Sequence, residues 1–171
     1  QLHDLQWEIS ENEARYRDLL DAQDDLIVRW DESRRLTFAN RAYWRAFDLD
    51  PTLALGTDHV PAVLDREDAS LEQVTGVRGR RSFRERVQTV SGPRWIEWEE
   101  HRVQHSGGKG EETHRSGRDI TDERRIAEEL RCLVCQNETI AASHADLAVD
   151  LRKQIRQKLQ QGQSEQQILD F

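Results

Sequence analysis

LIVRWDESRRLTFANRAYWRAF, residues 26–47, carries the pattern that decides the fold of the longer part of the chain. Its first five residues are a largely apolar run, the next four are polar, and residues 35–39 alternate apolar and polar side chains. Because successive side chains of a strand point to opposite faces, this pattern predicts two strands joined by a tight turn. Residues 40–47 place apolar side chains on one face of a short helix, which we expect to end at the Asp50-Pro51 pair.

The segments that follow predict further helix and then three strands. We expect a loop, a helix over residues 65–74, and strands over residues 82–89, 94–104 and 111–120, with glycine-containing turns between the strands. This order indicates an α+β fold with a five-stranded antiparallel sheet. The last strand is unusually polar at residues 111–116, so we expect its inner face to be poorly packed.

The N-terminal residues 1–20 predict a helix with one apolar seam. Its positions alternate steps of three and four and are Leu2, Leu5, Ile9, Asn12, Tyr16 and Leu19. This heptad spacing is typical of a coiled-coil linker through which a homodimer forms. A single surface helix packed on its own domain explains the same pattern, and both interpretations remain open.

The C-terminal residues 122–171 predict a small antiparallel helical bundle. Thr121 can cap a first helix, and a second is expected to begin at Ser143. Gly162 is a natural stop, and a capping box of Ser164 and Gln167 opens a third helix. The apolar stripes of the last two helices comprise Ala148, Leu151, Ile155, Leu159, Ile168, Leu169 and Phe171.

Composition restricts the classes of partner. The formal net charge is -8, from 25 Lys and Arg against 33 Asp and Glu, and no long basic run is present. We therefore expect no nucleic-acid partner. No stretch approaches the roughly 18 apolar residues of a membrane helix, so we expect a soluble segment. The chain lacks Met, opens on Gln1 and stops at Phe171 within an amphipathic pattern, which indicates a fragment whose membrane anchor, if any, lies outside it.

Four motifs in order within residues 13–121 together resemble the PAS family of sensor domains. They are Trp30-Asp31, Phe38-Ala-Asn40, Trp95-Ile-Glu-Trp98 and Gly117-Arg-Asp-Ile-Thr121. The resemblance implies a non-enzymatic, dimerising sensor domain over residues 21–121. It also implies a signal junction at Asp119 and Thr121, in which the aspartate pairs with a sheet arginine, here Arg94 or Arg118.

The PAS resemblance further implies a cavity for an unidentified small ligand. The aromatic candidates to line it are Trp30, Phe38, Tyr43, Trp44, Phe47, Trp95 and Trp98. More often such aromatics simply fill the core. His59 is a weak candidate haem ligand by analogy with oxygen-sensing relatives. The flavin chemistry of light-sensing relatives is excluded, because it requires a cysteine in this domain and none precedes Cys132.

Leu130-Arg-Cys-Leu-Val-Cys-Gln-Asn137, followed by Thr139-Ile140 and the amphipathic residues 146–152, closely resembles the thiol module of CcmH proteins. The resemblance continues to Ile168. It implies that Cys132 and Cys135 are catalytic and reduce the disulfide of apocytochrome c outside the cytoplasmic membrane. The implied partners are apocytochrome c and other cytochrome c maturation proteins, with haem only as a substrate of that pathway and no resident cofactor.

The spacing of the two cysteines supports thiol chemistry without the family. Two sulfurs separated by two residues can close a small ring, and the thiolate is the attacking species. Arg131 favours that thiolate, whereas the end of the preceding helix disfavours it, so the direction of any net pKa shift stays open. The alternative to thiol chemistry is that the two cysteines form half of a structural zinc site, with His144 as the nearest further ligand. A phosphoacceptor role for His144 is poorly supported, because the residues after it do not continue the histidine-kinase pattern.

The two resemblances imply different compartments and meet without a linker. CcmH modules work in the periplasm and most PAS domains are cytoplasmic, while Ile126-Ala-Glu-Glu-Leu130 fits both. A natural gene fusion, an engineered chimera and an assembly artefact each account for this junction. We expect a PAS sensor fused to a thiol-disulfide module. The alternative is a sensor and dimerisation fragment of a signalling protein with a structural or zinc-binding cysteine pair.

Overall fold

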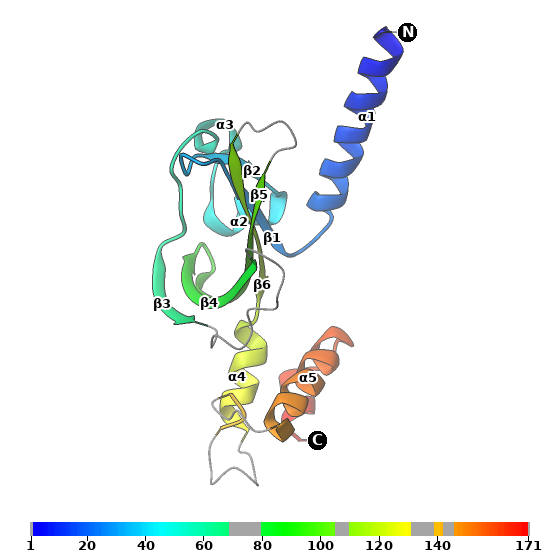
Figure 1. The fold of residues 1–171 in the computed structure, drawn as a ribbon. Coiled ribbons are helices and arrows are strands. Elements are labelled where there is room, and N and C mark those ends of the chain that lie inside the picture. The colour runs from blue at the N-terminus through cyan, green and yellow to red at the C-terminus, as the bar shows by residue number, and fades with distance from the viewer. Residues whose placement is uncertain (1, 69–79, 105–109, 131–138, 142–145, 171) are drawn as a thin grey trace. The chain divides into compact units, whose positions relative to one another are not determined.

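The computed structural model describes residues 2–68, 80–104, 110–130, 139–141 and 146–170 (Figure 1). The chain divides into two compact units, residues 1–119 and residues 120–171. Within the described residues no helix combines the length and the apolar composition that crossing a bilayer requires.

Unit 1, residues 1–119, is built on a six-stranded antiparallel sheet with strand order β2-β1-β6-β5-β4-β3. The strands are β1 (Leu26–Trp30), β2 (Leu36–Ala39), β3 (Val63–Asp68), β4 (Arg80–Thr89), β5 (Gly92–Gln104) and β6 (Glu111–Asp119). Buried and exposed positions alternate along β1, β4 and β5, as expected for a sheet with one face on a core. The α+β class is confirmed.

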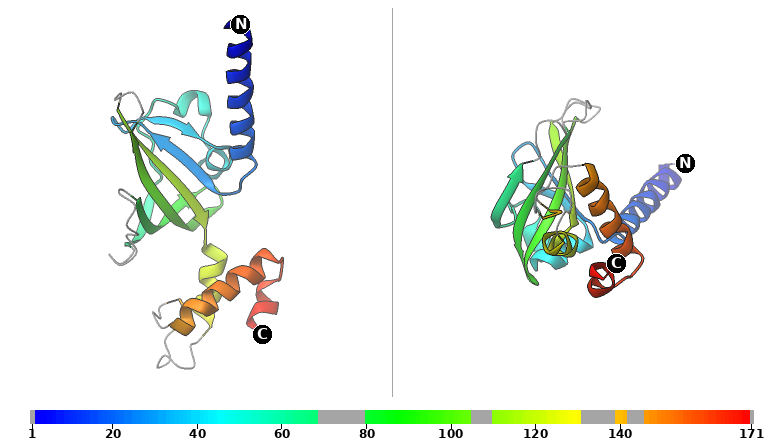
Figure 2. Two further views of the ribbon diagram at one scale, coloured as in Figure 1. Left: turned by 45° about the vertical axis from the view of Figure 1, so that its right-hand side comes forward. Right: turned by 90° about the horizontal axis from the view of Figure 1, so that it is seen from below.

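Three helices accompany the sheet: α1 (Leu2–Asp21), α2 (Arg41–Phe47) and α3 (Pro51–Ala54). α2 packs against β1 and β4 (Figure 2). The sequence predicted α2 correctly but left residues 51–54 as loop. There the Oδ1 atom of Asp50 accepts from the backbone N–H of Thr52 at 2.8 Å and Pro51 occupies the first turn, which together start a helix.

Asn40 joins α1, β1 and α2, and it is 0% exposed. Its Oδ1 accepts from the backbone N–H of Ile27 at 3.0 Å and of Tyr43 at 3.2 Å. Its Nδ2 donates to the carbonyl oxygens of Leu20 at 3.0 Å and Asp25 at 2.8 Å. One side chain therefore satisfies four backbone groups and fixes where the first hairpin meets its helix.

The helix predicted over residues 65–74 is wrong, because the described part of that range belongs to β3, Val63–Asp68. β3 adds a sixth strand beside β4, where the prediction had five strands in total. Opposite charges face each other across this pair: Arg66 opposes Glu85, and the neighbouring residues pair likewise. Cross-strand charge pairs of this kind stabilise a sheet edge. The remainder of the predicted helix lies outside the described residues.

The core of unit 1 lies between α2, α3 and one face of the sheet. Its buried members are Leu26, Val28, Trp30, Leu36, Ala39, Tyr43, Ala54, Phe83, Val87, Ile96 and Trp98. Gly117 of β6 faces Trp98 of β5 in register. A side chain at this position would overlap the tryptophan ring, so the glycine leaves the space that the ring of Trp98 occupies.

Unit 2, residues 120–171, contains α4 (Thr121–Glu129), α5 (Asp146–Gln160) and α6 (Glu165–Leu169). A second core joins them, with the buried residues Ile126, Ala127, Ile140, Ala148, Ile155 and Ile168. The capping box of Ser164 and Gln167 is confirmed, and Gly162 has a φ of 78 after α5. Ser143 and Phe171 lie outside the described residues.

Two ion pairs hold the helices of unit 2 together. Arg156 of α5 donates from Nε and Nη2 to the carboxylate of Glu123 in α4, at 3.2 and 2.9 Å. Arg125 of α4 lies 2.5 Å from Glu165 of α6. The predicted capping role of Thr121 is wrong: Thr121 is the first residue of α4, and the N-cap position is Ile120, which offers no side-chain hydrogen bond.

Candidate functional site

Two regions are candidates for function, and the first is the segment that contains the cysteine pair. Cys132, Cys135, Arg131 and His144 lie outside the described residues. The described residues around them show how the segment is anchored.

Hydrogen bonds bring the two sides of the cysteine segment together. The backbone N–H of Ile140 donates to the carbonyl of Leu130 at 3.0 Å, and that of Ala141 donates to the carbonyl of Ala127 at 3.0 Å. Arg152 of α5 also donates to the carbonyl of Ile140. Ile140 is 3% exposed, so its side chain anchors residues 139–141 in the core of unit 2. The residues on either side of the cysteine segment, residues 127–130 and 139–141, are therefore joined by hydrogen bonds.

The described residues contain no group of three or more His, Cys, Asp or Glu side chains placed to hold a metal ion. The proposed zinc half-site itself lies outside those residues. Cys132 and Cys135 remain predicted site residues, as does the signal junction. Asp119 ends β6 and Thr121 opens α4, and Arg118 donates to Glu97 of β5 at 2.8 Å.

The second candidate is the ligand cavity predicted among aromatic residues. Trp30, Tyr43 and Trp98 are buried in the core of unit 1, while Trp44 and Phe47 pack partly buried against it. Phe38 lies under the guanidinium of Arg29, at 4.6 Å from ring centroid to Cζ. The last of the seven, Trp95, lies on β5 and is partly exposed.

His59, the weak haem candidate, lies among aromatic rings. Its ring centroid is 6.0 Å from that of Tyr43 and 6.1 Å from that of Phe47. Burial lowers the pKa of His59 and raises the pKa of Tyr43 well above its ordinary value. Among the described residues, His59 Nε2, Tyr43 Oη and Trp98 Nε1 are buried without a hydrogen-bond partner.

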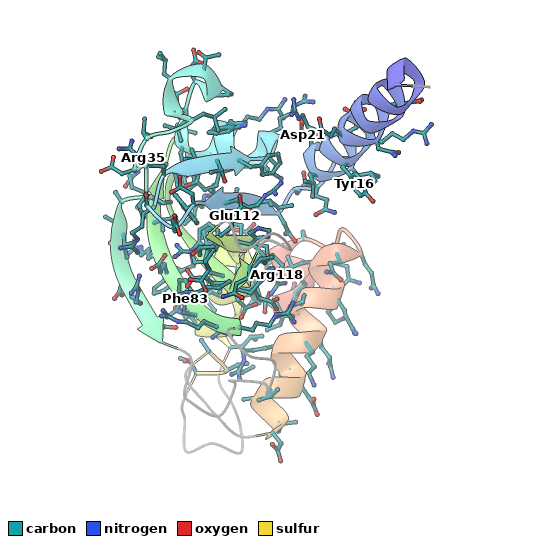
Figure 3. All side chains as sticks on the ribbon, turned by 45° about the horizontal axis from the view of Figure 1, so that its top comes forward. Tyr16, Asp21, Arg35, Phe83, Glu112 and Arg118 are labelled. Carbon is teal, nitrogen blue, oxygen red and sulfur yellow. The ribbon has the colours of Figure 1, made fainter. Side chains whose placement is uncertain are left out.

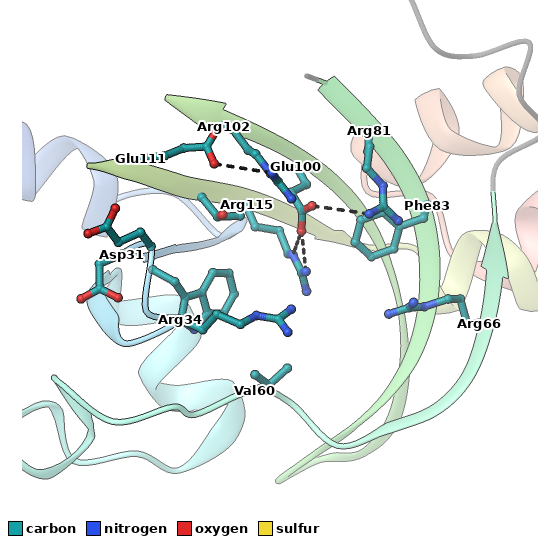
Figure 4. Close-up of a pocket in the computed structure, with 13 residues that line it drawn as sticks. Asp31, Arg34, Val60, Arg66, Arg81, Phe83, Glu100, Arg102, Glu111 and Arg115 are labelled. Atoms are coloured by element: carbon teal, nitrogen blue, oxygen red, sulfur yellow. Dashed lines mark hydrogen bonds and ion pairs between the residues drawn. The ribbon is translucent and has the colours of Figure 1, made fainter. Parts of the chain in front are cut away.

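A cavity of about 480 Å³ lies where β1, β4, β5 and β6 meet the chain before β3 (Figure 4). Of the seven aromatic candidates, Trp30 lines it, together with Phe83 and Val60. Its charged lining comprises Arg34, Arg66, Arg81, Arg102, Arg115, Asp31, Glu32, Glu100 and Glu111. The polar inner face expected for β6 is therefore part of the wall of a charged cavity.

Arg115 is the centre of the charged lining. It donates from Nε and Nη2 to Oε2 of Glu100 at 3.1 and 2.5 Å. Its guanidinium also lies over the rings of Trp30 and Phe83, with Cζ 5.1 Å from each centroid. Stacking and ion pairing together hold this guanidinium in a fixed position.

A second buried carboxylate lies beside this arginine. Glu85 is 1% exposed, lies 4.0 Å from Arg115, and accepts from Nε of Arg66 at 2.8 Å. A buried carboxylate is stable when hydrogen-bonded guanidinium groups compensate its charge. Sequence analysis missed these residues. The signal was present as charged residues among the alternate positions that share one face of the sheet: Arg81 and Glu85 on β4, Glu100 and Arg102 on β5, and Glu111 and Arg115 on β6.

Comparison with known proteins separates the two units. Residues 105–171 match the family model CcmH, "Cytochrome C biogenesis protein". This segment is CcmH-like. The CcmH protein of Pseudomonas aeruginosa is 54% identical over 48 residues, which are 28% of this chain and 31% of that protein. CcmH of Escherichia coli is 44% identical over 48 residues, 28% of this chain and 14% of that protein. The chain thus spans a third or less of these relatives.

The fold of unit 1 is similar to solved PAS domains. The PAS domain of an HTR-like protein from Haloarcula marismortui aligns with a TM-score of 0.53 and 20% sequence identity. The alignment covers 69% of this chain and 99% of that domain. Unit 1 therefore has a PAS fold. The CcmH match begins at residue 105 and so includes β6, although β6 pairs with β1 and β5 in the middle of the PAS-like sheet.

Proposed function

We propose that Cys132 and Cys135 reduce the disulfide of an apocytochrome c before haem attachment, and that the PAS-like unit acts as a sensor for this module. The observation that carries the proposal is the CcmH match over residues 105–171, which contains both cysteines of the chain. The hydrogen bond between Leu130 and Ile140 supports it, because a reactive pair needs supporting residues that are held in place.

The proposed reaction is thiol-disulfide exchange in two steps. A thiolate of the pair attacks one sulfur of the substrate disulfide, which forms a mixed disulfide and releases one substrate thiolate. The second cysteine then attacks the mixed disulfide and releases the other. The products are a Cys132–Cys135 disulfide and a substrate with two free thiols, to which haem can be attached. Apocytochrome c and other cytochrome c maturation proteins are the proposed partners, in a compartment outside the cytoplasmic membrane.

The test is reduction of an oxidised Cys-x-x-Cys-His peptide by the reduced full chain. Alkylation is specific here, because the chain has only these two cysteines. We expect alkylation and the double change of Cys132 and Cys135 to serine to abolish peptide reduction. Ser143→Ala, a neighbouring polar substitution, is the control and keeps activity. Reduction that continues after alkylation would refute the proposal.

A second candidate function, a dimerising sensor with a structural or zinc-binding cysteine pair, is favoured by α1. Tyr16 and Leu19 of the apolar seam are 70% and 64% exposed, and Tyr16 projects from the helix (Figure 3). Such a seam suits pairing with a second copy. Light scattering should then give a dimer that Tyr16→Glu with Leu19→Glu converts to monomer, while Arg15→Gln leaves it unchanged. Stoichiometric zinc retained by a chain inactive towards the peptide would favour this alternative.

A further inference from the structure

We infer that the charged cavity of unit 1 binds a small molecule carrying a carboxylate or phosphate group, with Arg34 and Arg81 as its charge-pairing residues. This inference deepens the proposed sensor role of unit 1 and rests on it. It starts from the distribution of charge partners around the cavity.

Three cavity arginines already have carboxylate partners. Arg115 is held by Glu100, and Arg66 by Glu85. Arg102 lies 3.5 Å from Glu111 at the exposed end of the sheet. In each of these pairs the carboxylate neutralises the arginine, and the pairs form part of the cavity wall. A ligand anion is therefore not needed to balance their charge.

The two remaining arginines of the cavity, Arg34 and Arg81, are less engaged. Within the described part of the chain, the side chain of Arg34 makes no hydrogen bond or ion pair. Arg81 reaches only Glu100, at 3.9 Å, and that carboxylate is already taken by Arg115. Figure 4 shows Arg34 and Arg66 entering the same space from opposite sides.

The backbone directs Arg34 into this space. It has a φ of 61, a left-handed conformation that is uncommon for an arginine, and its N–H donates to the carbonyl of Asp31 at 2.9 Å. The tight turn thus sets the position from which the side chain projects.

The two acids of the same turn, Asp31 and Glu32, also line the cavity. Oδ1 of Asp31 accepts from the backbone N–H of Arg35 at 2.9 Å. Oε2 of Glu32 lies beside Gly110, 3.4 Å from where a Cβ would be placed. Arg34 is therefore a cavity cation without a carboxylate partner among the described residues, and Arg81 has only the longer contact with Glu100.

The cavity dimensions and walls fit a small anion. A volume of about 480 Å³ is within the usual range for small-molecule sites. Guanidinium groups bind carboxylate and phosphate through paired N–H donors, which gives orientation as well as affinity. Trp30 and Phe83 provide a flat wall already stacked with Arg115. Partial enclosure by these rings strengthens the interaction of each charge with an anion.

The test is isothermal titration of the full chain, in its reduced form, with succinate and with inorganic phosphate. Succinamide is the uncharged control ligand. We expect saturable binding of at least one anion and none of succinamide. Arg34→Gln should weaken binding by at least about tenfold, since a charge-assisted hydrogen bond is lost. Arg81→Gln is a second variant, and Arg86→Gln, an exposed arginine on the opposite face of β4, is the matched control that keeps the affinity.

Each outcome decides one point. Binding of succinate alone assigns a carboxylate ligand, and binding of phosphate alone assigns a phosphate ligand. No saturable heat with either anion, or equal affinity in wild type, Arg34→Gln and Arg81→Gln, overturns the inference. Peptide reduction is measured on the same samples. If the chain reduces the peptide but binds neither anion, the proposed thiol function stands and this inference is refuted. If it binds an anion but does not reduce the peptide, this inference stands and the proposed thiol function is refuted.

Discussion

Replacing Gly117 by alanine is expected to destabilise unit 1 strongly, because the added methyl group has no room. A Cβ at this position overlaps the six-membered ring of Trp98 and lies 2.7 Å from Cγ2 of Ile96. Trp98 is 0% exposed and Ile96 is 1% exposed, so neither side chain can turn into solvent. Gly117 does not have a positive φ, and the effect is therefore overpacking rather than backbone strain.

The size of the effect follows from these two neighbours. Overpacking a well-packed core typically costs about 1 to 3 kcal/mol, and two immobile side chains place the cost of Gly117→Ala at about 3 kcal/mol. With a urea m value of about 2 kcal/mol/M, the unfolding midpoint falls by about 1.5 M. Tryptophan fluorescence measures this unit selectively, because all five tryptophans lie at or before Trp98.

The control is Ser116→Ala, at the adjacent exposed position, for which we expect a change within about 0.5 kcal/mol. Trp98→Leu removes the ring that the methyl overlaps, so the double variant should lose less stability than the sum of the two single changes. Equal destabilisation by Gly117→Ala and Ser116→Ala would refute the packing of β6 beneath Trp98.

Three further predictions test other parts of the structure. Asn40→Ala should cost about 2 to 4 kcal/mol in the same urea assay, because it leaves buried backbone groups unsatisfied. His101 has its pKa lowered by burial, with help from His114 across the strand pair. The unfolded chain therefore takes up this proton first, so the stability of unit 1 should fall as the pH drops below about 6.5. His101→Gln should reduce that slope, and an unchanged slope would contradict the assignment. Ser164→Ala should lower the stability of unit 2 by about 1 kcal/mol, measured by helical circular dichroism, because the capping box is lost.

Much of the fold could be predicted because the signals are local. The hairpin of residues 26–39, the short helix over residues 40–47 and the capping box at Ser164 each depend on side chains within a few residues of one another. β3 could not be predicted in this way. Its charged sequence has no strand pattern of its own, and its pairing depends on complementary charges of β4, such as Glu85 opposite Arg66.

The candidate sites divide in the same way. The cysteine pair is contiguous in sequence, so its chemistry could be inferred from Cys132 and Cys135 alone. The charged cavity takes one arginine from a turn, one from β3, and others from β4, β5 and β6. Strand register brings them together, and a pattern along the chain does not contain that register.

The order of residues along the chain was enough to predict two parts, the PAS-like order of elements and a cysteine pair between two amphipathic helices. That most of the predicted aromatics fill the core, and that a charged cavity lies beside them, became visible in the folded arrangement of the strands. The physical reason is that burial and charge pairing are properties of side chains that meet across strands. Arg115 becomes a wall residue only where Glu100, Glu85 and Trp30 surround it.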